Sequence, residues 1–277
     1  MVTILLLLAI PFQVNAEVEW QIDNTLKPGQ PPLDVAVPPN GQWIFVLTAD
    51  GNILIYSSNG ELADTIKVGP HIDQIRVGPG SEQIYATSRQ NQTVEVISLD
   101  FIRKINVTGS PFKGRMDAPV TVTVFSDFQW AYCARLVPQL EQLLEKYPTD
   151  VKVVFKNFPI RSHKFAVQAA MAALAAGRQD KFWEFHDALF KNYNRLNEQK
   201  IQEIATQLGL DQTKFEEQRK NPVEAARIRQ DYEEGLGIGV RGTPTIFING
   251  KKLKTRSMEN MEAIINEELK AAKAKKE

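Results

Sequence analysis

The sequence is poor in the residues that build disulfides and zinc sites. It contains one cysteine, Cys133, and three histidines among 277 residues. A single cysteine cannot form a disulfide within the chain, whatever compartment holds the protein. Zinc sites use clustered cysteine and histidine ligands, whereas these four residues are scattered along the chain. We therefore predict no metal site, and no pattern in the sequence indicates a cofactor.

An excess of charge of either sign is also missing. The 33 lysines and arginines are balanced by 33 aspartates and glutamates. This balance argues against nucleic acid or an anionic membrane as the main partner. Hydrophobic residues make up 43% of the chain and charged residues 24%, as is usual for a soluble globular protein. The length exceeds that of one typical domain, so we expect two.

The N-terminus carries an apolar run that is too short to span a bilayer. Residues 4–10 are apolar, and Val14-Asn15-Ala16 fits the small-x-small pattern of a signal-peptidase site. We predict a signal peptide at 1–16 and export, to the periplasm of a bacterium. No lysine or arginine precedes the apolar run, so an uncleaved anchor is the alternative. The membrane is a partner only in that second case.

A linker at 17–32 leads to residues 33–110, which read as short strands separated by turns. The pattern occurs twice with a period of about 40 residues, as in propeller blades. Four strands are expected in the first repeat, at Val35–Val37, Ile44–Thr48, Ile53–Tyr56 and Asp64–Val68. Four more are expected in the second, at Ile75–Val77, Gln83–Thr87, Thr93–Ile97 and Arg103–Val107.

These repeats resemble the YVTN and NHL-type β-propeller repeats, in Asp34–Asn40, Trp43–Leu47 and Ile53–Tyr56. Two blades cannot close a ring, so their open sheet edges must be covered or tolerated. One hypothesis is that the blades pair with a second chain, making an oligomer, or pack on the C-terminal domain. The other is a β-sandwich spacer with no binding role.

Residues 111–277 change to an alternation of strands and helices. A β–α–β unit is expected at Val120–Phe125, 134–147 and Val151–Phe155, with a parallel strand pair. Helices are then expected at Phe165–Ala176, Lys181–Asn192, Glu198–Leu208, Asp211–Lys220 and Pro222–Gly235. Strands at Thr245–Asn249 and Lys252–Thr255 and a helix at 258–273 complete the order. This order predicts an α/β thioredoxin fold with a helical insertion, preceded by a small all-β domain of two propeller-blade-like repeats.

The same region resembles the DsbA-like disulfide oxidoreductase family. The resemblance lies in 117–121, 125–135, Val154–Pro159, 181–190 and 239–245, over roughly 155 residues in the family's order. It implies a Cys-x-x-Cys motif at the start of the first helix. Here that motif reads Trp130-Ala131-Tyr132-Cys133, so only the second position keeps its sulfur. Indole cannot form a thiolate, which excludes the usual two-thiol cycle in the chain as written.

The resemblance places the cis-proline loop of the family at Gly242-Thr243-Pro244. It implies that Thr243 and Pro244 bind an extended substrate peptide, together with Ala131 and Tyr132. Polypeptide substrates or a redox partner protein are therefore the expected partners. A strand-end capping role is expected for Asp127, with proton transfer as the alternative. Structural roles are expected for His163 and for His186, which lies in an aromatic stretch.

Two classes of function remain open for the C-terminal domain, and a purely structural adaptor built around the blades is a third option for the chain. In the first, the domain is a thiol–disulfide oxidoreductase that acts through Cys133 alone, or through a selenocysteine whose UGA codon has been read as Trp130. In the second, the domain is a redox-inactive module that binds polypeptides as a chaperone does, with Trp130 adding apolar contact area and Cys133 an inert buried thiol. The codon at position 130 distinguishes the two oxidoreductase versions.

Overall fold

The computed structural model describes residues 18–79 and 82–274, and the expected signal peptide at 1–16 lies outside them. The chain divides into two compact units, residues 1–99 and 100–277. None of the helices in the described ranges has the length and apolar content that a membrane span requires.

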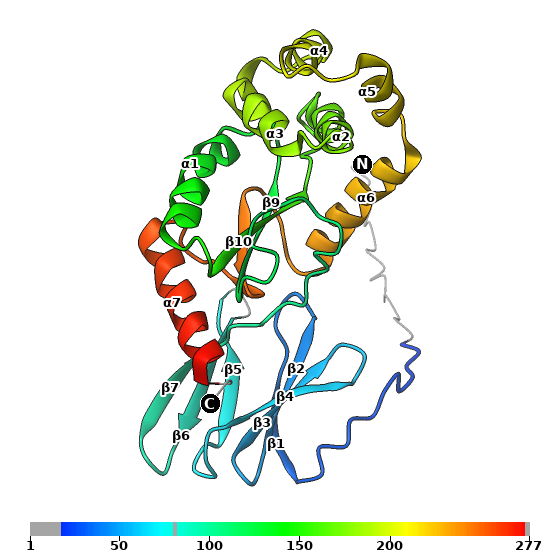
Figure 1. The fold of residues 1–277 in the computed structure, drawn as a ribbon. Coiled ribbons are helices and arrows are strands. Elements are labelled where there is room, and N and C mark those ends of the chain that lie inside the picture. The colour runs from blue at the N-terminus through cyan, green and yellow to red at the C-terminus, as the bar shows by residue number, and fades with distance from the viewer. Residues whose placement is uncertain (1–17, 80–81, 275–277) are drawn as a thin grey trace, which may run out of the picture. The chain divides into compact units, whose positions relative to one another are not determined.

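The first unit contains two antiparallel sheets (Figure 1). One has the order β1-β2-β3-β4 and the other β5-β6-β7. Their strands are β1 (Pro32–Ala36), β2 (Trp43–Thr48), β3 (Asn52–Ser57), β4 (Leu62–Lys67), β5 (Gln74–Val77), β6 (Gln83–Ser88) and β7 (Thr93–Ser98). The central strands carry buried apolar residues, which are consecutive at 45–47 in β2 and alternate in β6, at Ile84 and Ala86. The sequence therefore predicted an antiparallel all-β region correctly, and the likeness of its two sheets to propeller blades stays a prediction.

The eighth expected strand, Arg103–Val107, is not a strand. The backbone of this segment bonds instead to the second unit, to which it belongs. The Arg103 N–H donates to the Gly250 carbonyl at 2.9 Å, and the Asn106 N–H donates to Glu234 Oε1 at 2.6 Å. The backbone N–H groups of Arg103 and Asn106 therefore already have acceptors, whereas a fourth strand would direct such groups to β7. The units accordingly separate between Leu99 and Asp100, about ten residues before the boundary expected at 110–111.

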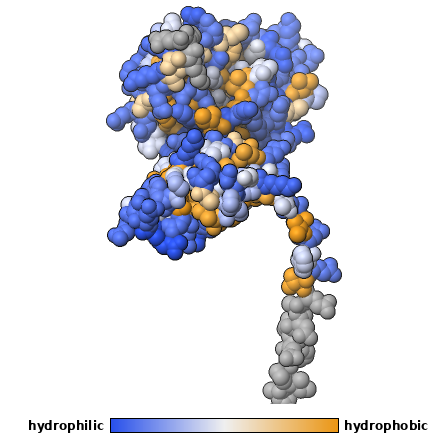
Figure 2. Space-filling view, turned by 90° about the horizontal axis from the view of Figure 1, so that it is seen from below, coloured by the Kyte–Doolittle hydropathy of each residue, from blue (hydrophilic) through white to orange (hydrophobic). Residues whose placement is uncertain are grey.

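The exposed apolar residues of the first unit lie before β1 and on three of its strands. Val18, Trp20 and Ile22, in the segment before β1, are 80%, 82% and 74% exposed. Figure 2 shows apolar residues, in orange, on the narrow segment next to the grey residues. Strands β1 and β4 carry further exposed apolar residues, and strand β7 is also exposed, with Val94 at 63% and Val96 at 57%. The corresponding strand of the first sheet, β3, is almost wholly buried and pairs with β4 at its outer edge. Strand β7 has no such neighbour among the described residues.

The second unit is built on a five-stranded mixed sheet with the order β12-β11-β9-β10-β8. Strands β9 (Val120–Ser126) and β10 (Val151–Asn157) are parallel and joined by α1 (Ala131–Lys146), as expected. Strand β11 (Thr245–Ile248) runs antiparallel to β9, and β12 (Lys251–Lys252) follows it. The short edge strand β8 (Phe112–Gly114) was missed, because three residues give no alternation to read.

The helices fall into two groups (Figure 1). Helix α1 and α7 (Met258–Ala274) pack on one face of the sheet, through Leu136, Leu143, Met261 and Ile265. The helical insertion comprises α2 (Ala166–Gly177), α3 (Phe182–Lys191), the short 3-10 turn Tyr193–Arg195, α4 (Glu198–Gln207), α5 (Gln212–Gln218) and α6 (Pro222–Gly237). It has its own apolar core, centred on the alanines of α2. This is a thioredoxin fold with a helical insertion, as the sequence predicted.

Candidate active site

The site begins where β9 ends and α1 starts. Trp130 is the residue before the first turn of α1, with extended φ and ψ of −99° and 122°. Its carbonyl accepts the N–H groups of Cys133 and Ala134, at 3.0 and 3.1 Å. Its side chain makes no capping hydrogen bond, and Ala131 is the first helical residue. A residue at position 130 therefore lies beside the unpaired N–H groups and the positive end of the helix dipole, where a thiolate or selenolate is stabilised.

Cys133 lies one turn further on and faces inward. The residue is 1% exposed and belongs to the apolar core of the helical insertion. Burial raises the pKa of its thiol, and the nearby side chains of Ser126 and Thr243 only partly oppose this. At neutral pH the side chain is therefore a protonated thiol, which is a poor nucleophile. This arrangement suits an inert or a resolving cysteine better than an attacking one.

The loop before β11 faces the same turn. In the register between β11 and β9, Thr245 lies opposite Phe125, so residues 243–244 run beside Ser126 and Asp127. The Thr243–Pro244 peptide bond is cis, as expected for the proline loop of the resemblance. Thr243 is 7% exposed, and its Oγ1 is buried with no partner in hydrogen-bonding geometry among the described residues, although it is close enough to Cys133 to affect the thiol.

Asp127 and His163 form a pair next to Trp130. The Asp127 carboxylate is buried and accepts the N–H groups of Gln129 at 2.7 Å and Ile160 at 2.6 Å. These bonds are the capping role that the sequence suggested. Its Oδ2 also lies 3.0 Å from His163 Nδ1, and the imidazole packs against the Trp130 indole with ring centroids 5.4 Å apart. The sequence predicted only a structural role for His163, because α1 and β10 separate it from Trp130 along the chain.

An aromatic and cationic rim surrounds position 130. Tyr132 is 49% exposed, and its ring centroid lies 5.3 Å from that of Trp130. The guanidinium groups of Arg135 and Arg256 lie 4.3 and 5.9 Å from the Tyr132 ring. Arg256 also donates to the Pro244 carbonyl at 3.3 Å, so it joins the two sides of the site. No pattern in the sequence indicates Arg256, which lies in the loop before α7.

His186 lies away from this site, in the aromatic core of the helical insertion. Its ring centroid is 4.8 Å from that of Phe190, 4.9 Å from Trp183 and 5.3 Å from Phe155. Burial lowers the pKa of this histidine, although the Asp187 carboxylate, 2.8 Å away, raises it in part. No group of three or more His, Cys, Asp and Glu side chains in the described part of the chain is placed to hold a metal ion.

Comparison with known proteins supports the architecture of the second unit. The Thioredoxin family model matches residues 106–267, which is more than half of the chain. A thioredoxin-like oxidoreductase from Silicibacter pomeroyi is 27% identical, with a TM-score of 0.54 over 58% of this chain and 92% of that one. Oxidised BdbD from Bacillus subtilis is 26% identical, with a TM-score of 0.51 over 60% and 95%. The thiol-disulfide exchange protein alpha-DsbA2 from Wolbachia pipientis is 21% identical and shares the fold, with a TM-score of 0.52 over 57% and 86%.

The curated relatives carry a different name. The Na(+)/H(+) antiporter NhaA 3 of Salinispora tropica is 35% identical over 155 residues, covering 56% of this chain and 24% of that protein. The chain thus spans about a quarter of the length of the curated relatives it matches. Antiport is named for those whole proteins, and the rest of their length has no aligned counterpart here, so their activity does not transfer. The family match rests on the second unit, and by it the chain belongs to the thioredoxin family.

Proposed function

We propose that the second unit is a thiol–disulfide oxidoreductase of the DsbA-like kind, whose exchange residue occupies position 130 and whose resolving residue is Cys133. The burial of Cys133 in the first turn of α1, beside the proline loop, is the observation that carries this proposal. A resolving thiol needs to reach only its own partner, so burial suits it, whereas position 130 lies at the helix N-terminus. The 27% identical thioredoxin-like oxidoreductase adds support.

This proposal requires a selenocysteine at position 130 whose codon was read as tryptophan. A selenolate there would attack one sulfur of a substrate disulfide, so that a Se–S bond forms while the S–S bond breaks and the second sulfur leaves as a thiolate. The Cys133 thiolate would then attack the selenium, closing a Se–S bond within the chain and releasing the first substrate sulfur as a thiolate. The substrate gains two electrons and the site loses them. The reverse sequence oxidises a dithiol.

The codon at position 130 tests the proposal directly. UGA at this codon supports it, and the mass of the protein purified from its own organism should then contain one selenium atom. UGG contradicts it, and so does a native mass that fits tryptophan. The version in which Cys133 acts alone has less support, because its sulfur is buried and its pKa is raised. Insulin reduction by the tryptophan-containing chain that is lost in Cys133→Ala would restore that version.

A redox-inactive polypeptide-binding module is the second candidate. The rim of Trp130, Tyr132, Arg135 and Arg256 beside the proline loop favours it, because aromatic rings and guanidinium groups are common in peptide-binding surfaces. This module would bind a reduced, unfolded polypeptide with the same affinity in the parent chain and in Cys133→Ala. Fluorescence anisotropy of a labelled unfolded polypeptide measures that affinity, and Tyr132→Ala should weaken it.

Export also belongs to the proposal, on the residue pattern at 1–16. N-terminal sequencing of the mature protein tests it, and cleavage after Ala16 is the expected result.

For the first unit, we propose that its seven strands are two blade-like repeats whose open side is covered by a second copy. The exposure of β7, set against the burial of β3, supports this covering. Light scattering tests it: a monomer for the whole chain would leave the spacer as the better interpretation.

A further inference from the structure

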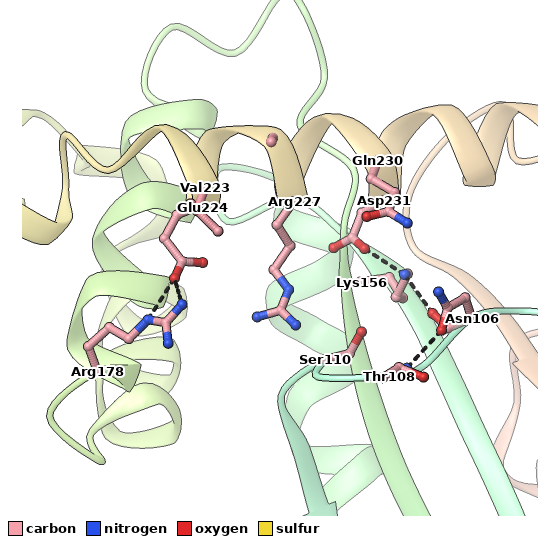
Figure 3. Close-up of a pocket in the computed structure, with 11 residues that line it drawn as sticks. Asn106, Thr108, Ser110, Lys156, Arg178, Val223, Glu224, Arg227, Gln230 and Asp231 are labelled. Carbon is pink, nitrogen blue, oxygen red and sulfur yellow. Dashed lines mark hydrogen bonds and ion pairs between the residues drawn. The ribbon is translucent and has the colours of Figure 1, made fainter.

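A cavity of about 350 Å³ lies in the second unit, between α6 and residues 106–110 (Figure 3). A second cavity of about 460 Å³ shares Ser110, Arg178, Glu224 and Arg227 with it. Together we call them the Arg227 cavity. Volumes in this range suit a small ligand. Neither Cys133, Trp130 nor Thr243 lines it, so it is distinct from the candidate active site.

Arg227 is the cation without a partner in this cavity. Figure 3 shows its side chain extending from α6 between two ion pairs. In one pair, Arg178 Nε lies 2.7 Å from Glu224 Oε1, and in the other, Lys156 Nζ lies 2.5 Å from Asp231 Oδ1. Within residues 18–79 and 82–274, Arg227 has no hydrogen bond or ion pair. Its planar fork of N–H donors is therefore available to an anion.

The turn beneath Arg227 is shaped around the guanidinium. Gly109 has a φ of +67°, and a Cβ at this position would lie 2.3 Å from Arg227 Nη2. A glycine is thus required both by the backbone and by the space that the guanidinium occupies. The next residue, Ser110, is 8% exposed, and its hydroxyl makes no hydrogen bond in the described part of the chain. Because Ser110 lines both parts of the cavity, its hydroxyl is available to a ligand or to water there.

The lining restricts the charge and shape of the ligand. The carboxylates of Glu224 and Asp231 also line the cavity, so a dianion such as phosphate is repelled more strongly than a singly charged carboxylate. The larger part of the cavity contains a further carboxylate, that of Asp180, and it adds five apolar side chains. These are Pro111, Phe112, Leu174, Phe182 and Trp183. A ligand that fits both parts has one carboxylate and an apolar body.

We propose that the Arg227 cavity binds an apolar carboxylic acid, of the kind that ends a polypeptide chain in an apolar residue. The Arg227 guanidinium holds the carboxylate through paired N–H donors, as such forks commonly do. The Ser110 hydroxyl donates to one carboxylate oxygen. The apolar body lies against Phe182 and Trp183. This binding is independent of the chemistry at position 130.

Ligand-observed NMR or calorimetry on the full chain tests the proposal, with N-acetyl-leucine as the probe and N-acetyl-leucinamide as its uncharged match. We expect the acid to bind at least about tenfold more tightly than the amide, because a charge-assisted bond is lost in the amide. Arg227→Gln should remove that difference in affinity, and Ser110→Ala should weaken the binding of the acid by about threefold.

Arg229→Gln is the matched control, since Arg229 is an exposed arginine on the same helix and does not line the cavity. It should bind the acid as the parent chain does. Thermal melting of each variant confirms folding, and Gly109→Ala gives a second route to displacing the guanidinium. Equal binding of acid and amide overturns the proposal, as does inorganic phosphate binding more tightly than the acid. Discrimination that survives in Arg227→Gln overturns it as well.

Discussion

The two sides of the candidate active site differ in how completely they are built. The proline-loop side has a cis Thr243–Pro244 bond, a buried threonine and a strand, β11, in register with β9. The helix side has the turn, the buried Cys133 and the paired Asp127 and His163, but an indole at the helix N-terminus. The proline loop and the helix turn are thus both formed, and the two proposed functions differ in what they require of the side chain at position 130.

Replacing Trp130 by cysteine should have the largest effect. The new thiol would lie at the N-terminus of α1, where the helix dipole favours the thiolate, and Cys133 would follow three residues later. We expect insulin reduction at least about 100-fold faster than in the tryptophan-containing chain, because an activated nucleophile replaces an inert ring. Trp130→Ser controls for the loss of the indole. Equal activity in the cysteine and serine variants would mean that the helix side is not a redox site.

The rate at which Cys133 is alkylated measures how accessible and how ionised its thiol is in the folded chain. Burial raises the pKa of the thiol, so little thiolate is present at neutral pH. We expect iodoacetamide to react at least about tenfold more slowly with the folded chain at pH 7.5 than with the chain unfolded in guanidinium. The rate should rise with pH. Equal rates in the two states would show an accessible, attacking thiol and would revive the single-cysteine mechanism.

The raised pKa of Cys133 also has a consequence for stability. The thiol contributes stability that is fully present below its unfolded-state pKa, near 8.5, and is lost as the pH rises through the folded-state value. Denaturant unfolding between pH 8 and 10 should therefore show a smaller loss of stability in Cys133→Ala than in the parent chain. Parallel pH profiles for the two chains would contradict the burial of the thiol.

Burial of His186 should make the stability of the helical insertion sensitive to acid. The folded-state pKa of His186 is lowered by burial, so its stability contribution is present above about pH 6.5 and is lost as the pH falls below it. We expect unfolding free energy to fall by up to about 1.4 kcal/mol per pH unit there, because one proton is taken up on unfolding. His186→Gln should flatten this slope. A slope that persists unchanged in His186→Gln would contradict the assignment of the acid-sensitive group to this buried histidine.

The sequence predicted the elements whose signal is local. Val120–Phe125 and Val151–Phe155 are apolar runs, and both are strands of the central sheet. The start of α1 was placed three residues late, because Trp130 offers no capping oxygen to mark it. Arg103–Val107 has a strand-like pattern, but its backbone bonds to Gly250 and Glu234, which are more than 120 residues away. Contacts of that range leave no mark on a local pattern.

The site was predictable to the extent that it follows the family motif. Cys133 lies close to Thr243, and the Thr243–Pro244 bond is cis, as the resemblance implied. The same resemblance did not place His163 against Trp130, nor Arg256 at Pro244. Both contacts join residues from different elements, and both depend on side-chain directions that only packing decides. The unpartnered Arg227 was missed for the same reason, since its neighbours lie on α2, β10 and residues 106–110.

Replacing Thr243 by valine should have the smallest effect, and it tests whether the proline-loop side is complete without a ligand. The Thr243 Oγ1 is buried and has no hydrogen-bond partner among the described residues. Exchanging an unpartnered hydroxyl for a methyl group of similar shape should change the unfolding free energy by less than about 1 kcal/mol, in either direction. Thr243→Ala, which also leaves a void, is the control and should cost more. A loss above about 2 kcal/mol in the valine variant would mean that the hydroxyl already has a partner, and that this side of the site contributes to stability as well as to peptide binding.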